Sequence, residues 1–255
     1  QLRTAERALF AINMGGTAIG TGLNAPEGFA ESTAKHLAKL TGKPYEPAPD
    51  LIAATSSLHG FLVYANALRS LSATLSKIAS DLILLSSGPR AGLGEIVLPA
   101  VQAGSSIMPG KVNPVIPEVV NQIAFEVIGN DMTVTMAAEA GQLQLNAFEP
   151  IIAYSLFRSI PHLRQGCIVL ARQCVTGITA NRARLEETVR HTIGIVTALN
   201  PYIGYEKSSA LAKEAHATGR GVYELVLEKG WLTKDELDRI LSPENLTQPR
   251  PAIRL

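Results

Sequence analysis

An apolar heptad repeat within residues 51–85 is the feature that most limits how this chain can fold. One series recurs every seven residues and a second follows it three positions later: Phe61, Leu68, Leu75 and Leu82, then Tyr64, Leu71, Ile78 and Leu85. This is the a/d spacing of helices that pack nearly parallel to one another. At 1.5 Å per residue the predicted helix is about 50 Å long, a length that suits an elongated bundle.

Other apolar patterns with helical spacing surround this repeat. They cover residues 117–140 and 147–175, and Pro161 inside the second predicts a kink. Residues 1–14 have the pattern of a helix end, and strand signals are scarce. The sequence therefore predicts an all-α protein built on a bundle of long helices.

The composition changes near Gly177, which predicts a second domain. Beyond it the helical patterns are shorter and more charged, with glycines and prolines between them. Thr233 and Glu236 are spaced as a capping box at a helix start. We expect a central helical-bundle domain over residues 1–177 and a small C-terminal helical domain over 178–255.

Composition and charge exclude several classes of function. Hydrophobic residues make up 46% of the chain and charged residues 18%, so part of the apolar surface is expected to be buried against other subunits. The net charge of +1 gives no case for binding nucleic acid or an anionic membrane. No long uncharged apolar run predicts a membrane span. Cys167 and Cys174 are expected to be buried free thiols in a reducing cytoplasm.

The long connection 86–114 ends in a segment whose residues packing does not explain, Gly104-Ser-Ser-Ile-Met-Pro-Gly-Lys-Val-Asn-Pro114. Two hydroxyls, an ammonium and an amide lie between glycines and prolines. The segment is not a Walker A loop, because five residues separate its glycines and Val112 follows the lysine. The glycines of segment 15–22 likewise do not fit G-x-G-x-x-G. An anionic ligand held under a mobile flap is the interpretation that remains.

These residues resemble the signature loop of the aspartase/fumarase superfamily. The resemblance extends along the whole chain, through Gly15-Gly-Thr-Ala-Ile-Gly-Thr-Gly-Leu-Asn24 and Ser86-Ser-Gly-Pro-Arg-Ala-Gly-Leu93. Pro117-Glu-Val-Val-Asn-Gln122 and Gly141-Gln-Leu-Gln-Leu-Asn146 are similar to the aspartate ammonia-lyases rather than to the fumarases. By comparison, this chain is expected to lack roughly the first two-fifths of a typical member, including Thr/Ser-rich substrate segments and a site histidine.

The resemblance implies a fold, an assembly and a reaction. Members of the superfamily are homotetramers with a twenty-helix core and active sites built from three subunits. The implied reaction is the reversible deamination of L-aspartate to fumarate and ammonia in the cytoplasm, without a cofactor and with possible activation by a divalent cation such as Mg²⁺. The five histidines of the chain show no ligand spacing, so no metal site is predicted.

The reaction assigns roles to the signature residues. The resemblance makes Ser105 the base that removes the Cβ proton. Backbone N–H groups of a tight loop are expected to stabilise the serine alkoxide that this role requires. Lys111 fits a cation facing a substrate carboxylate, with Asn113 and Ser106 as hydrogen-bond donors. Gly104 and Gly110 fit as loop hinges.

Glu118 has two readings. Relatives pair the matching glutamate with a histidine of another subunit, whereas an acidic residue in a first helical turn is also favoured by the helix dipole. Glu139, Gln142 and Asn146 could line the active-site cavity, although a polar layer within the helical bundle is the simpler explanation of these three residues.

Two alternative functions stay open at this point. One is a fumarate hydratase of the same superfamily. The other is a non-catalytic helical oligomerisation fragment, and the chain alone is expected to be inactive.

Overall fold

The computed structural model of residues 1–255 describes the whole chain except Pro89, Ala103, Ser105, Ser106, Pro109 and residues 249–255. It divides into two compact units, Gln1–Thr179 and Ala180–Leu255, where the sequence placed the boundary after residue 177. Each unit is described by itself. The all-α prediction is confirmed, since every strand among the described residues is only two residues long.

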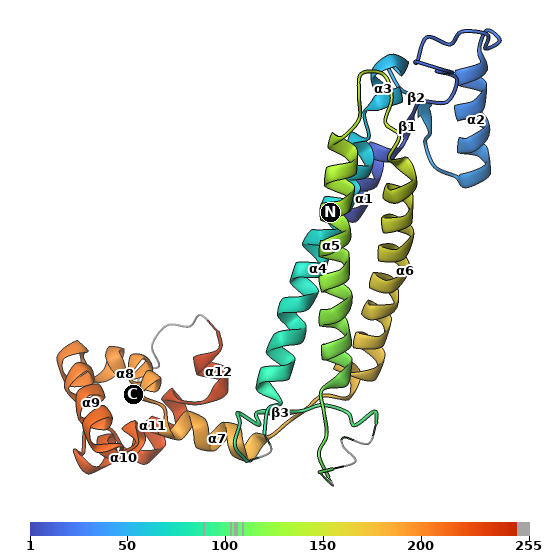
Figure 1. The fold of residues 1–255 in the computed structure, drawn as a ribbon. Coiled ribbons are helices and arrows are strands. Elements are labelled where there is room, and N and C mark those ends of the chain that lie inside the picture. The colour runs from blue at the N-terminus through green and yellow to red at the C-terminus, as the bar shows by residue number, and fades with distance from the viewer. Residues whose placement is uncertain (89, 103, 105–106, 109, 249–255) are drawn as a thin grey trace. The chain divides into compact units, whose positions relative to one another are not determined.

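The first unit contains three long helices and a set of short elements at one end of them (Figure 1). The long helices are α4 (His59–Leu85), α5 (Val115–Glu139) and α6 (Glu149–Gln173). The short elements and the connections are α1 (Leu2–Glu6), η1 (Arg7–Leu9), β1 (Ala11–Ile12), α2 (Phe29–Thr41), β2 (Glu46–Pro47), α3 (Leu51–Ser56), β3 (Ile96–Val97) and η2 (Val175–Gly177). Strands β1 and β2 pair in parallel, and β3 pairs with β4 (Thr179–Ala180).

The single helix predicted over residues 51–85 is wrong at its start, because the chain breaks between α3 and α4. Ser57 adopts an extended conformation, and α4 begins only at His59. A close contact accompanies this break: a Cβ on Gly60 would lie 2.4 Å from the backbone oxygen of Ala8. The turn η1 therefore packs directly on the first turn of α4. Because α4 begins at His59, it has 27 residues and is about 40 Å long.

The helix predicted over residues 1–14 is also too long. It ends at Glu6 and continues only as the 3₁₀ turn η1. Ile12 instead lies in β1, opposite Pro47 of β2. Pairing with a distant strand overrides the local helical pattern here.

Helices α4, α5 and α6 bury one face each against the others. Their shared core contains Ala65, Leu68, Val127, Val134, Ala137, Ile152, Leu156 and Leu163. The buried face of α4 consists of small residues around Leu68, namely Ala65, Ser72 and Ala79. Of the heptad residues only Leu68 is fully buried, and Phe61 and Ile78 stay 40% and 44% exposed. The heptad stripe thus supplies more apolar surface than this chain buries by itself.

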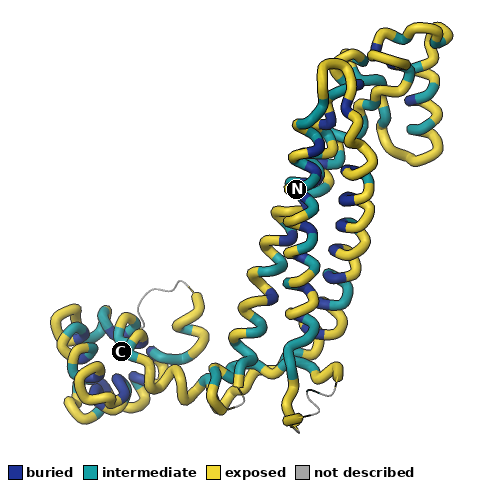
Figure 2. Tube along the Cα trace, in the orientation of Figure 1, coloured by how far each residue is buried: buried dark blue, intermediate teal, exposed yellow. Residues whose placement is uncertain are grey.

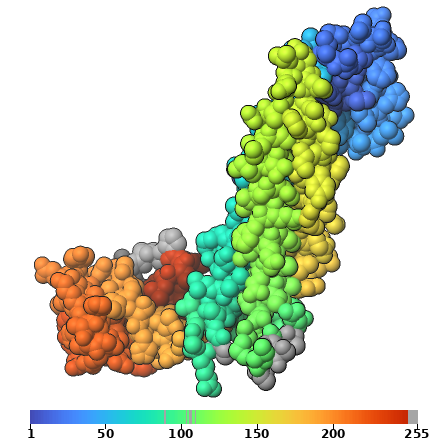
Figure 3. Space-filling model, viewed as in Figure 1, coloured from blue at the N-terminus to red at the C-terminus, as the bar shows by residue number. Residues whose placement is uncertain are grey.

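Helix α5 carries a second exposed apolar stripe. Phe125, Ile128, Met132 and Met136 follow the spacing i, i+3, i+7 and i+11, which places them on one side of the helix. All four side chains are exposed, Met136 to 65%. Figure 2 shows yellow, exposed positions recurring along the bundle, and in Figure 3 the side chains of α5 form the front of the bundle. We call these four residues the α5 stripe.

The second unit is a small helical domain with a core of its own. Its elements are α7 (Arg182–His191), η3 (Ile193–Ile195), α8 (Val196–Ile203), α9 (Tyr205–Thr218), α10 (Val222–Glu228), α11 (Lys234–Ile240) and α12 (Pro243–Leu246). Leu199, Leu211, Val222, Leu237 and Ile240 are fully buried in that core. The predicted capping box is confirmed, with Thr233 and Glu236 bonded reciprocally at the start of α11.

Two smaller expectations can be compared with the structure. Both cysteines are free, but only Cys174 is buried and Cys167 is half-buried, so the prediction of two buried thiols is half right. None of the helices in the described part of the chain has the length and apolarity needed to cross a membrane.

Candidate functional site

The signature segment lies in the connection between α4 and α5, and its two ends meet. A Cβ on Gly104 would lie 1.2 Å from the backbone oxygen of Lys111 and 2.9 Å from the backbone nitrogen of Val112. Only glycine, which has no Cβ, allows this approach. The contact closes the segment at its base, and we call Gly104, Lys111 and Asn113 the loop neck.

Asn113 fastens the neck. Its side-chain Nδ2 donates a hydrogen bond of 2.9 Å to the carbonyl oxygen of Gly104. A side-chain amide carries two N–H donors, so this bond uses one and leaves the other for a second acceptor. The structure thus gives Asn113 a structural contact in addition to the substrate contact predicted from the sequence.

The remaining described residues of the segment are open to solvent. The backbone N–H of Lys111 donates to the carbonyl of Met108, and Gly110 adopts φ +80°, a left-handed conformation that favours glycine. The side chain of Lys111 is exposed, as is that of Ile107, which is 87% exposed. Ser105 and Ser106 lie outside the described residues, so their predicted roles stay predictions.

Glu118 lies in the first turn of α5 with its side chain exposed. Its backbone N–H donates to the carbonyl of Pro114, which starts the helix just after the loop neck. This position is compatible both with a residue that pairs outside this chain and with a first-turn acid favoured by the helix dipole.

A polar contact missed in the sequence analysis holds the start of α5 to the end of α4. Ser76 Oγ donates to Asn121 Oδ1 at 2.9 Å, and Asn121 Nδ2 donates to Ser80 Oγ at 3.3 Å. Asn121 is part of the Pro117–Gln122 motif, so a signal was present, but its partners on α4 could not be read from the motif. This contact fixes the helix end from which the signature segment projects.

The other glycine-rich segment, residues 15–24, lies at the opposite end of the long helices. A Cβ on Gly20 would lie 2.3 Å from Cα of Ile52, which packs the segment on α3, before α4 begins. The signature segment follows the far end of α4. The two segments are therefore separated by about the 40 Å length of that helix, and one copy of the chain does not bring them together.

Among the other polar candidates, Asn146 has a structural role in this chain. It is buried where α5 turns into α6, and its Nδ2 donates to the carbonyl of Ala137 at 2.9 Å. Its Oδ1 accepts from the backbone N–H of Phe148 at 2.8 Å. Glu139 and Gln142 are exposed at the same turn.

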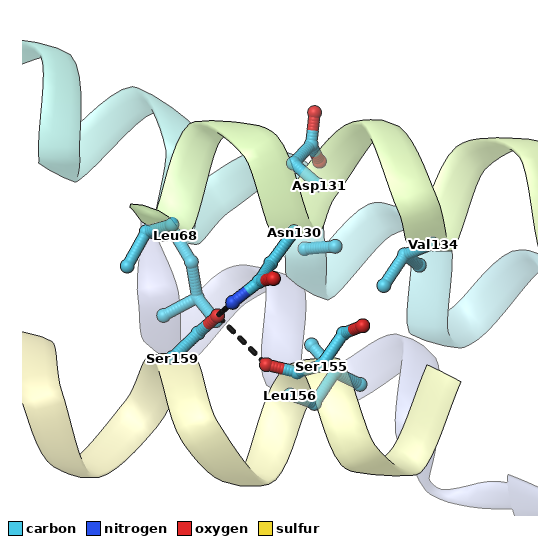
Figure 4. Close-up of a pocket in the computed structure, with 9 residues that line it drawn as sticks. Leu68, Asn130, Asp131, Val134, Ser155, Leu156 and Ser159 are labelled. Carbon is cyan, nitrogen blue, oxygen red and sulfur yellow. Dashed lines mark hydrogen bonds between the residues drawn. The ribbon is translucent and has the colours of Figure 1, made fainter. Parts of the chain in front are cut away.

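A buried polar layer crosses the middle of the bundle. Asn130 Nδ2 donates to Ser159 Oγ at 3.0 Å, and Ser159 Oγ donates to the carbonyl of Ser155 at 2.7 Å. They line a cavity of about 10 Å³, which is close to the space of a single water molecule. In Figure 4 the carboxylate of Asp131 points away from the Asn130–Ser159 pair.

Asp131, next to Asn130 on α5, is a buried carboxylate whose hydrogen bonding is incomplete. Its side chain is 4% exposed, and its Oδ2 lies 3.4 Å from Nε of Arg69 on α4. Its Oδ1 is buried and has no hydrogen-bond partner among the described residues. Burial raises the pKa of Asp131, and the nearby charge of Arg69 opposes that rise only in part.

A second carboxylate of α5 has the opposite environment. Glu126 pairs with Nδ1 of His162 and with Nη2 of Arg158, both at 2.6 Å. The hydrogen bond from His162 is the main cause that lowers the pKa of Glu126, with further help from Arg158. Arg158 also donates to the hydroxyl of Tyr154 at 2.8 Å.

The described residues contain no group of three or more His, Cys, Asp or Glu side chains that could hold a metal ion. The signature segment itself offers one ammonium, one amide and backbone groups near its closed base, together with the two serines that lie outside the described residues.

Comparison with known proteins places this chain among lyases. A family model described as "Lyase" matches residues 1–129, and one described as "Fumarase C C-terminus" matches residues 195–248. Similar curated proteins are named aspartate ammonia-lyase. Those of Pseudomonas aeruginosa, Escherichia coli and Helicobacter pylori are 56%, 55% and 53% identical over 97%, 97% and 98% of this chain. The chain spans about half the length of these relatives, 52%, 52% and 53%.

Solved structures agree with these matches. A fumarate lyase:delta crystallin of Brucella melitensis, bound to cobalt, gives a TM-score of 0.91 at 48% identity, over 97% of this chain and 54% of that one. A class II fumarase of Schistosoma mansoni gives 0.86 at 32% identity, over 98% and 56%. By its sequence matches and its fold, the chain belongs to the lyase family of the aspartase/fumarase superfamily.

Proposed function

We propose that the whole protein to which this chain corresponds is an aspartate ammonia-lyase, which converts L-aspartate reversibly to fumarate and ammonia. The observation that carries the proposal is the 53–56% identity to proteins of that name over nearly the whole chain. The reaction uses proton transfer and needs no cofactor. It would take place in the cytoplasm, where reducing conditions keep the two cysteines free.

In this mechanism Ser105 removes a proton from Cβ of L-aspartate. That proton is weakly acidic, so the step requires a strong base and stabilisation of the dianionic carboxylate that forms. A serine hydroxyl becomes such a base only beside groups that stabilise its alkoxide. The closed loop neck supports this role, because it holds the two ends of a glycine-containing segment together, and backbone N–H groups of a tight loop can form an oxyanion site.

Lys111, Asn113 and Ser106 would hold the carboxylate that gains charge. Lys111 supplies a full positive charge from an exposed position in the loop neck. Asn113 would use its second N–H for the substrate while the first keeps its bond to Gly104. Closure over the substrate, with Gly104 and Gly110 at the loop ends, would exclude water and strengthen these contacts. Glu118 would act with a group from another subunit.

We also propose a homotetramer whose active sites are shared between subunits. Two observations support it. Phe61 and Ile78 of the heptad stripe and all four residues of the α5 stripe remain exposed in the single chain, and surfaces of this kind mark contacts between proteins. In addition, the two glycine-containing family segments lie at opposite ends of the long helices, so they could meet only between copies that run antiparallel.

The test is an assay of a chimera in which residues 1–255 replace the matched part of the Pseudomonas aeruginosa enzyme. We expect fumarate, followed by its ultraviolet absorbance, to form from L-aspartate. Ser105→Ala should lower kcat by several orders of magnitude with little change in stability, because a loop serine contributes little to folding. Near-normal kcat in that variant would place the base elsewhere.

The same assay separates the alternatives. A chimera that assembles and forms malate from fumarate, but no fumarate from L-aspartate, is a fumarate hydratase. One that assembles and turns over neither substrate leaves only the oligomerisation role. Residues 1–255 alone are expected to be inactive. Adding Mg²⁺ or EDTA to the active chimera tests the divalent activation that the superfamily resemblance implies.

A further inference from the structure

The second unit contains a cleft that the proposed reaction does not use. Its volume is about 370 Å³, within the range of about 300–1,000 Å³ that is typical of small-molecule sites. Its apolar lining comes from α7, from Ile195 and from the turn after α11: Leu185, Val189, Ile195, Leu241 and Pro243. Val189 is 40% exposed, so among the described residues part of this apolar surface is left uncovered.

Helix α7 also presents two opposite charges to the cleft. Glu186 and Arg190 are one helical turn apart and line the cleft beside Leu185 and Val189. Both side chains are exposed. Within the described part of the chain, neither side chain is in a hydrogen bond or an ion pair, although the positive charge of Arg190 helps to lower the pKa of Asp238 across the cleft. A carboxylate and a guanidinium therefore line the cleft wall.

On the opposite wall, the polar side chains already have hydrogen-bond and ion-pair partners within this unit. The hydroxyl of Tyr223 donates to Oδ1 of Asp238 at 2.6 Å, and Nζ of Lys234 lies 3.1 Å from Oδ2. Burial and the hydrogen bond to Asp238 raise the pKa of Tyr223 to about 12, so this hydroxyl stays protonated at neutral pH. Asp238 therefore contributes a carboxylate with two donors in place, which would still repel an incoming anion.

We propose that this cleft binds a free α-amino acid with an apolar side chain, of the size of leucine. Its carboxylate would pair with Arg190, its ammonium with Glu186, and its side chain would cover Val189 and Leu241. A zwitterion matches both charges, whereas a simple carboxylic acid leaves Glu186 facing an apolar ligand. A dicarboxylate such as L-aspartate would place a second negative charge near Glu186 and Asp238. The cleft would therefore disfavour the substrate that the proposed active site binds.

Ligand-observed NMR on residues 1–255 with L-leucine tests the proposal. Saturable binding is expected, and L-leucinamide and 4-methylpentanoate should each bind about tenfold more weakly, because each loses one charge contact. L-Aspartate should also bind about tenfold more weakly, because its side-chain carboxylate is repelled by Glu186 and Asp238. Absence of saturable leucine binding overturns the proposal. Equal binding of leucine and leucinamide also overturns it, because Arg190 would then hold no carboxylate.

Variants of α7 locate the site. Glu186→Gln and Arg190→Gln should each weaken leucine binding about tenfold, and Val189→Trp should abolish it by filling the cleft. Glu187→Gln is the matched control, because it removes the same charge from the same helix at a residue that pairs with Arg184 and does not line the cleft. Circular dichroism checks that each variant folds. Leucine binding that is unchanged in Glu186→Gln and Arg190→Gln would refute the assignment.

Discussion

Gly104 shows how a single residue can determine the geometry of a functional segment. Its lack of a side chain lets the backbone of Lys111 approach to a distance that no other residue permits, and its carbonyl accepts from Asn113. The sequence analysis assigned Gly104 to a hinge and Asn113 to the substrate. The structure adds that both residues hold the loop closed, a role that depends on backbone atoms and that composition cannot reveal.

We expect Gly104→Ala to open the loop neck, because its Cβ would overlap the carbonyl of Lys111. Trypsin should then cut after Lys111 several-fold faster, while the thermal midpoint of the long-helix bundle changes little. Gly129→Ala is the control. No atom lies within 4 Å of a Cβ at this position of α5, so alanine should stabilise the helix by about 0.5–1 kcal/mol. Unchanged cleavage after Lys111 in Gly104→Ala would show that the neck does not restrain the loop.

At the scale of elements, α5 carries two carboxylates with opposite effects on stability. Glu126 is held by His162 and Arg158, so its pKa is lowered and its charged form stabilises the fold. Asp131, five residues later, is buried with one oxygen unpartnered, so its pKa is raised and its charged form destabilises the fold. The same helix therefore responds to acid in two directions.

Glu126→Gln should lower the thermal midpoint at neutral pH. The hydrogen bond from His162 holds the folded pKa of Glu126 below its ordinary value, so its stabilisation is present above the ordinary pKa and is lost as the pH falls through the folded pKa. The difference from the parent chain should therefore disappear in acid. Glu139→Gln, at an exposed end of the same helix, should show little difference throughout. Thermal melts from pH 3 to 7 make the comparison.

Asp131→Asn should raise the thermal midpoint at neutral pH. The folded pKa of Asp131 lies above 3.8, so its charge costs stability above the folded pKa, and protonation relieves the cost as the pH falls through that value. The gain should thus shrink in acid, opposite in sign to the change for Glu126→Gln. A lower midpoint at pH 7 would mean that the ion pair with Arg69 outweighs the burial of the carboxylate.

The sequence predicted the long helices better than it predicted how they begin or what they contact. Helix α5 lies close to the predicted residues 117–140, because apolar periodicity is a local property. The break before His59 coincides with a close approach of Ala8 to Gly60, a contact between distant residues that a local pattern does not reveal. At the candidate site, the resemblance identified the segment, but the partners of Asn113 and Asn121 required coordinates. Ser105 and Ser106 stay predictions.

At the scale of the whole molecule, the exposed apolar surface is the main indication of assembly. The α5 stripe runs along one side of a helix whose buried residues already pack on α4 and α6. A single chain gains nothing from this stripe, whereas a second copy could bury it.

We expect Met132→Glu, which puts a charge in the middle of the α5 stripe, to lower the oligomeric state of residues 1–255. Burying an unpaired carboxylate at a subunit contact costs several kcal/mol, on the order of 3–5. Ala73→Glu, at an exposed position of α4 outside both stripes, should leave assembly unchanged. Light scattering after size-exclusion chromatography gives the mass. If Met132→Glu keeps the mass of the parent chain, the α5 stripe is not a subunit contact.

The loop neck has an evolutionary consequence. Because Gly104 and Lys111 already meet at the base of the segment, the residues between them in the chain can be replaced without altering the helices that carry it. Apart from Gly110, whose positive φ favours glycine, we expect substitutions there to change reactivity more than folding. A protein with this property can change its reaction through one short loop while its helical core is preserved.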